Sequence, residues 1–288
     1  MSFDASVALR AAVPQATSPA RAPRRALVIA VLAALLAVGS IAAAPAPVAA
    51  AGVKVAIIVG PSGANTQTYK TQARSYASLA RSYGATVVEV YTPNATWSRA
   101  KAAAQGANLL IYLGHGNGFP NPYSSTLDPR KVGGFGLNPV AWKGNTTTRY
   151  YGEYYVRTQI TLAPNAVVLL NHLCYSAGSS EPGRANPTLS TAKKRVDNYG
   201  AGFLRAGARV VFAETLYNAS YVIRSLFTTN RTMSQVFWAA PSKTGTYKVS
   251  FASVRTSGMA VLMDPRKPHQ FYRSVVGKLT MTASTWRP

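Results

Sequence analysis

The sequence predicts an α/β protein with three layers, in which a mostly parallel sheet carries helices on both faces. Short apolar runs without polar alternation, such as Leu109–Leu113 and Ala166–Leu170, are typical of strands that are buried on both faces of a parallel sheet. Segments with apolar residues at three- and four-residue spacing lie between such runs, as expected of crossover helices. The right-handed crossover rule then restricts the topology.

The first half of the chain alternates strand and helix from residue 53 onward. Val53–Val59 is an apolar run that ends at a Gly-Pro-Ser-Gly turn, and Thr66–Tyr83 has helical spacing followed by Gly84, a suitable helix end. Thr86–Tyr91 is expected to be a strand and Ser98–Gln105 a short helix. The strand Leu109–Leu113 comes next.

A long segment follows this strand and separates it from the next. Asn117–Pro164 is rich in Gly, Asn, Pro and Tyr and is long for a connection, so we expect an insertion with its own helix and hairpin. After the run that ends near Cys174, we expect a helix, a strand, two helices and a final strand or helix, at Ala192–Ala206, Arg209–Ala213, Tyr217–Phe227, Ser234–Ala239 and Gln270–Thr282.

The N-terminal 51 residues have the composition of an export leader. Four arginines precede Ala26–Ala44, a segment without charge, and an Ala/Pro-rich stretch leads to Ala49-Ala50-Ala51. A basic region, an apolar region and small residues are typical of a cleaved secretory signal. An uncleaved membrane anchor is the alternative, because nineteen uncharged residues could just span a bilayer. We therefore expect residues 52–288 to be one α/β domain outside the cytoplasm, secreted or in the cell envelope, with no further membrane span.

The charge balance is strongly basic. The whole chain has a formal net charge of +23, and residues 52–288 keep 27 basic and 7 acidic side chains. Such a field favours anionic surfaces, including cell-envelope polymers. The basic residues are scattered and no recognised nucleic-acid module surrounds them, so no dedicated nucleic-acid binding is expected. A solvated basic surface without a specific partner is the simpler explanation.

Two predicted strands end in residues that carry chemistry. His115-Gly116 follows Leu109–Leu113, and Cys174, the single cysteine of the chain, follows the second run. Neighbouring strands lie about 4.8 Å apart, so adjacent strands would bring His115 and Cys174 together at the carboxyl edge, where ligands bind in α/β sheets. A thiol beside an imidazole indicates a cysteine nucleophile, although a lone cysteine is more often a buried apolar side chain and can also pair with another molecule.

These motifs resemble the caspase-fold (clan CD) cysteine peptidases, the group of caspases, metacaspases, legumain, clostripain, gingipains and CHAT domains. The resemblance covers about Val53 to Phe227. It rests on the strand that ends in His-Gly, the strand that ends in Cys 59 residues later, and the helix-to-strand element Ala206-Gly207-Ala208. The chain departs from the family in having His172-Leu173 before the cysteine, Gly178 one place late and Gly114 before the histidine.

The resemblance implies peptide-bond hydrolysis by a Cys174–His115 dyad, with the backbone N–H groups of Gly116 and Cys174 as the oxyanion hole. It also implies that the loop after the cysteine, with Tyr175 and Ser176, forms part of the substrate cleft. The residue that sets specificity is left open. Two carboxylates at the functional edge are candidates, Glu181 and Glu214. Glu181 could instead be a solvated loop charge, and Glu214 could form a salt bridge or lie next to a helix N-cap.

The sequence contains no cofactor motif, and a metal site is disfavoured. His172 and Cys174 share a strand face and could join His115 around zinc, but such a site would use most of the three histidines and one cysteine present. We therefore expect His172 to be a core or supporting residue. The departures from the family pattern leave a second function class open, a degenerate, non-catalytic domain that binds the cell envelope or a polyanion through its basic surface.

Overall fold

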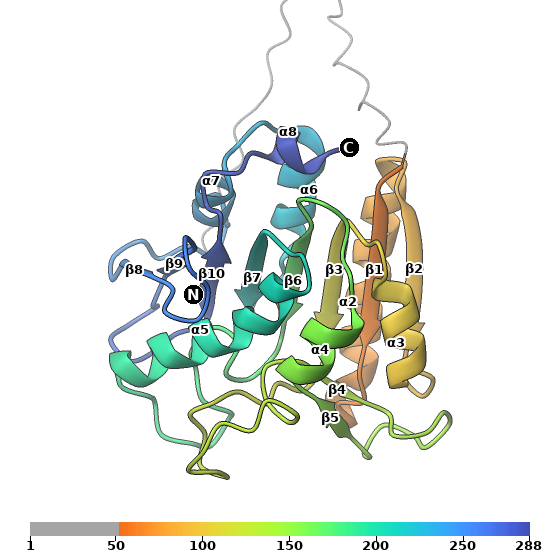
Figure 1. Ribbon diagram of the computed structural model, residues 1–288, viewed down its shortest axis with the longest axis horizontal. Coiled ribbons are helices and arrows are strands. Elements are labelled where there is room, and N and C mark those ends of the chain that lie inside the picture. The colour runs from red at the N-terminus through yellow and green to blue at the C-terminus, as the bar shows by residue number, and fades with distance from the viewer. Residues whose placement is uncertain (1–51) are drawn as a thin grey trace, which may run out of the picture. The chain divides into compact units, whose positions relative to one another are not determined.

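A computed structural model describes residues 52–288, which contain an eight-stranded sheet with the strand order β2-β1-β3-β6-β7-β10-β9-β8 (Figure 1). Five neighbouring strands are parallel: β2 (Thr86–Tyr91), β1 (Lys54–Val59), β3 (Leu109–Leu113), β6 (Val167–Asn171) and β7 (Val210–Glu214). Three antiparallel strands complete it: β10 (Arg273–Gly277), β9 (Ala260–Met263) and β8 (Val249–Ala252). The predicted α/β fold with a mostly parallel sheet is confirmed.

Helices cover both faces of this sheet, and each central strand is therefore buried on both sides. In β1, Ala56 and Ile58 join one apolar core, and Val55 and Ile57 join the other. The first core packs against α3 (Trp97–Ala104), α4 (Glu153–Gln159) and α5 (Leu189–Arg205). The second packs against α2 (Thr66–Ser82), α6 (Ser220–Thr228), α7 (Met233–Trp238) and α8 (Ala283–Trp286), and a short 3₁₀ turn, η1 (Gly63–Asn65), precedes α2.

The segment between β3 and β6 contains secondary structure of its own, as predicted. β4 (Phe135–Leu137) and β5 (Arg149–Tyr151) form a separate antiparallel pair, and α4 follows them (Figure 1). The Tyr112 hydroxyl at the end of β3 accepts a hydrogen bond from the Gly136 N–H at 2.8 Å, which ties the insertion to the sheet. The insertion therefore begins next to His115 and packs against the carboxyl edge of the sheet.

The antiparallel part of the sheet is where the structure adds most to the sequence prediction. The segment Gln270–Thr282, expected to be a strand or a helix, contains the strand Arg273–Gly277, whereas β8 and β9 were not predicted.

The predicted leader, residues 1–51, lies outside the described residues. Within residues 52–288, no helix combines the length and the apolarity needed to cross a membrane.

Candidate functional site

The sheet brings His115 and Cys174 to the same edge. β3 and β6 are hydrogen-bonded neighbours, with Leu113 paired to Asn171, and each candidate residue follows the carboxyl end of its strand. Both side chains line one cavity of about 580 Å³. The sequence argument depended on these two strands being neighbours, and the structure pairs them in parallel.

The backbone at Gly116 lies directly against Cys174. A β-carbon at position 116 would come within 2.1 Å of the Cys174 carbonyl oxygen and 2.9 Å of its nitrogen, so only glycine fits. Within residues 52–288, the Gly116 N–H has no acceptor, and the Cys174 N–H has none apart from its own thiol sulfur. The Gly116 backbone therefore packs against the backbone of Cys174, and the Gly116 N–H has no partner among the described residues.

The loop that carries His115 is fixed through its backbone. The Tyr112 hydroxyl lies 3.1 Å from the His115 carbonyl oxygen and 2.9 Å from that of Gly136. The imidazole itself is exposed and, within the described part of the chain, makes no hydrogen bond. Its ring is therefore available to a thiol or a substrate.

Both members of the pair are neutral in the resting site at pH 7. Burial, and secondarily the charge of Glu181, raises the pKa of the Cys174 thiol to about 11. Loss of hydration at the cavity wall lowers the pKa of His115, and Glu181 opposes this shift. A neutral imidazole in the same cavity as a neutral thiol is a group that can accept the thiol proton.

The His172 ring is bound by partners other than His115 and Cys174. Its ring stacks on Tyr69 with centroids 4.7 Å apart, and its Nδ1 and Nε2 lie 3.1 Å from the Thr215 carbonyl oxygen and 2.7 Å from Gln72 Oε1. The Gln72 amide donates to Asn171 Oδ1 at 3.0 Å, which links α2 to the end of β6. His172 thus has the supporting position expected from the sequence, although it lines the same cavity as Cys174.

The cavity contains further polar groups on the loop after Cys174. Glu181 lines it, and its carboxylate accepts hydrogen bonds from the Tyr123 hydroxyl and from Arg184 Nε, the latter at 3.3 Å. Ser179 also lines it, and its buried hydroxyl has no hydrogen-bond partner within residues 52–288. Sequence reasoning missed Ser179 and Tyr69, because no local pattern distinguishes them.

The cavity that contains Cys174 is not lined by the other three predicted substrate-binding residues, Tyr175, Ser176 and Glu214. Tyr175 is buried and lines a neighbouring cavity. The Ser176 hydroxyl is buried and donates to the Leu173 carbonyl at 3.0 Å, which makes it a turn residue.

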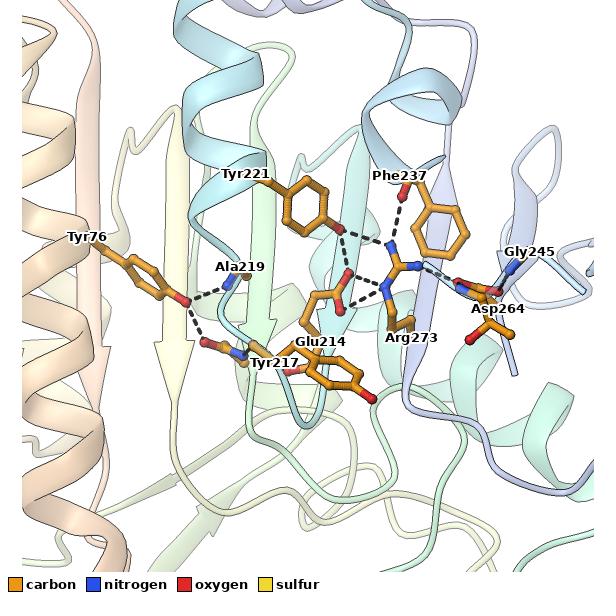
Figure 2. A network of polar contacts seen from close by, with 11 residues as sticks. Tyr76, Glu214, Tyr217, Ala219, Tyr221, Phe237, Gly245, Asp264 and Arg273 are labelled. Carbon is orange, nitrogen blue, oxygen red and sulfur yellow. Dashed lines mark hydrogen bonds and ion pairs between the residues drawn. The ribbon is translucent and has the colours of Figure 1, made fainter. Parts of the chain in front are cut away.

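Glu214 is fully buried and forms an ion pair instead of a pocket. Its two carboxylate oxygens lie 2.9 and 3.0 Å from Arg273 Nε, and it also accepts from Tyr221, as Figure 2 shows. The other end of Arg273 binds Asp264 at 2.5 Å and the Phe237 carbonyl at 2.7 Å. The predicted pocket role of Glu214 is therefore corrected to the ion-pair alternative, because an antiparallel strand places an arginine opposite it.

No group of three or more His, Cys, Asp or Glu side chains that could hold a metal occurs within residues 52–288. Comparison of the chain with family models, curated proteins and solved structures gave no match.

The pKa of Cys174 predicts an unusual alkylation profile. The iodoacetamide reaction rate should rise about tenfold per pH unit from pH 7 to 10 without a plateau, because a pKa of about 11 keeps the thiolate scarce throughout this range. Cys174 is the only thiol, so mass spectrometry reports this site alone. Glu181→Gln removes a charge that raises this pKa and should increase the rate at pH 8. A plateau below pH 8 would contradict the neutral resting pair.

Proposed function

We propose that this protein is an exported cysteine peptidase that hydrolyses peptide bonds with Cys174 as nucleophile and His115 as its base. One observation carries the proposal: the two side chains follow the paired strands β3 and β6 and line one cavity, with the Gly116 backbone against Cys174. The resemblance of the sequence motifs to caspase-fold peptidases supports the same assignment.

In the proposed reaction, His115 takes the Cys174 proton as the sulfur bonds to the substrate carbonyl carbon. The N–H groups of Gly116 and Cys174 donate to the resulting oxyanion, since neither is taken up by a backbone carbonyl in the described residues. The intermediate collapses as His115 gives its proton to the leaving amine, which departs and leaves a thioester on Cys174. A water molecule, deprotonated by His115, then releases the carboxylate product and restores the thiol.

The pKa directions favour this order of proton transfer over a preformed ion pair. A thiol with a pKa of about 11 remains protonated at neutral pH, and an imidazole with a lowered pKa remains unprotonated. The thiolate therefore forms only as the substrate is attacked, when the oxyanion hole stabilises the charge that has been transferred.

Cleavage of a fluorogenic peptide library by the purified full chain tests the proposal. We expect wild-type protein to cleave at least one class of peptide, and Cys174→Ala and His115→Ala each to lose at least about 1,000-fold in kcat/KM. His269→Ala is the matched control, because His269 is an exposed histidine that does not line the cavity. A Cys174→Ala protein with wild-type cleavage would exclude the dyad. Absence of cleavage by folded wild-type protein would favour the non-catalytic binding domain.

A further inference from the structure

Three neighbouring cavities share walls and lead away from the dyad. Glu181 lines both the cavity that contains Cys174 and a second cavity of about 540 Å³ that also includes Gly116, Tyr150 and Tyr175. Asp128, Lys131 and Tyr150 line this second cavity and a third of about 350 Å³. An extended chain attacked at Cys174 can therefore continue along the insertion toward the third cavity.

The third cavity is cationic. It is lined by Arg130, Lys131 and Arg149, all exposed, and by a single acid, Asp128, which lies 3.6 Å from the Lys131 amine. The guanidinium groups of Arg130 and Arg149 have no carboxylate partner within residues 52–288. Two guanidinium groups thus face solvent without a carboxylate partner, in a cavity that is lined by one acid.

Both guanidinium groups are oriented by aromatic rings. Arg130 lies over the Tyr154 ring at 4.7 Å and Arg149 over the Tyr151 ring at 5.2 Å. Stacking restricts the side chain and leaves the N–H groups at the guanidinium edge free to bind a carboxylate with two parallel hydrogen bonds. These two arginines are therefore held in place for a carboxylate, and both line the same cavity.

The second cavity, which shares lining residues with the cavity of Cys174 and with the cationic cavity, supplies a further polar group. The Tyr175 side chain is 1 % exposed, and its hydroxyl has no hydrogen-bond partner among the described residues. A buried hydroxyl without a partner is unfavourable unless a ligand or water completes it. A substrate backbone in this cavity would offer the missing carbonyl or N–H group.

We propose that the substrate is an acidic peptide segment, with Asp or Glu side chains displaced from the scissile bond and bound by Arg130 and Arg149. This inference rests on the proposed peptidase function. A peptide is favoured over an acidic polysaccharide because the cationic cavity joins, through shared walls, the cavity where the dyad attacks an amide.

Two matched fluorogenic peptide libraries test this inference, one with Asp and Glu and the other with Asn and Gln in their place. We expect wild-type protein to favour the acidic library by roughly 5- to 20-fold in kcat/KM, mainly through KM and less at high salt. The double variant Arg130→Glu, Arg149→Glu should lose or reverse the preference. Arg224→Glu, on α6 against the opposite face of the sheet, should retain it.

Fluorescence anisotropy with Cys174→Ala protein measures binding of the same peptides independently of turnover. Preferential binding of the acidic peptides that Arg130→Glu, Arg149→Glu abolishes would support the cationic site even if wild-type protein cleaved nothing, a result that refutes only the peptidase proposal. Equal binding of both libraries, or no effect of the double variant, would overturn the inference. So would tight heparin binding that depends on these arginines without any preference for acidic peptides.

Discussion

Replacing Arg273 with methionine is expected to lower the free energy of unfolding by about 3–5 kcal/mol. Arg273 is fully buried at the start of β10, between β7 and β9, where it binds the carboxylates of Glu214 and Asp264 (Figure 2). Asp264 in turn accepts from the Thr244 and Gly245 N–H groups at 2.9 and 2.8 Å. Without the guanidinium, two buried carboxyl groups lose their cation and the Phe237 carbonyl loses a donor. Denaturant unfolding of the purified protein at pH 8, above the pKa of about 7 of Glu214, measures the change.

Arg81→Met is the matched control, because Arg81 forms an exposed ion pair with Glu89 and should contribute less than about 1 kcal/mol.

Glu214→Gln tests the contribution of Glu214 separately from that of Asp264, the other carboxylate that Arg273 binds. Burial raises the pKa of Glu214 to about 7, against the opposing effect of Arg273. The native state then binds more protons than the unfolded state between about pH 4.5 and 7, so this group makes stability fall as the pH rises through that window. Glu214→Gln should remove that part of the fall. An Arg273→Met protein with an unchanged unfolding midpoint would contradict the ion-pair assignment.

Gly116→Ala is expected to reduce peptide cleavage by at least about 100-fold, on the scale of losing an oxyanion donor. The new β-carbon would lie 2.1 Å from the Cys174 carbonyl oxygen, so the two loops must move apart and separate the donors from the thiol. Circular dichroism and unfolding of the same sample show whether the protein remains folded, and kcat/KM on the best library peptide measures the loss.

Gly183→Ala is the control for this substitution. Gly183 lies on the loop after Cys174 and lines the same cavity, has a positive φ of 81°, and has open space where a β-carbon would be. Only backbone strain is added there, on the order of 1–2 kcal/mol, so cleavage should persist in folded protein. Retention of activity within a few-fold by Gly116→Ala would exclude a tight approach of Gly116 to the nucleophile.

The parallel half of the sheet could be predicted because burial on both faces leaves a clear sequence pattern. All five residues of β3 and of β6 are buried, and both were visible as continuous apolar runs. β8 was not visible, since its residues alternate between half-buried and exposed and include a serine at the sheet edge. Short edge strands of this kind depend on their partner more than on their own composition.

The positions of His115 and Cys174 could be predicted because strand ends define the carboxyl edge. The hydrogen-bond and ion-pair partners of these edge residues, which are distant in sequence, could not be predicted. Glu214 is bound by Arg273, 59 residues later, and His172 is held by Gln72, 100 residues earlier. The cationic cavity likewise combines residues on both sides of the β4–β5 pair, which only the folded insertion brings together.

Intact-mass spectrometry of protein quenched in acid during turnover tests the central claim most directly. A peptide ester or thioester substrate should leave its acyl group on the protein, and digestion should locate it on the segment that contains Cys174. Cys174→Ala should show no adduct, and His115→Ala should form it far more slowly. Hydrolysis that proceeds without any adduct and survives Cys174→Ala would contradict the proposed nucleophile.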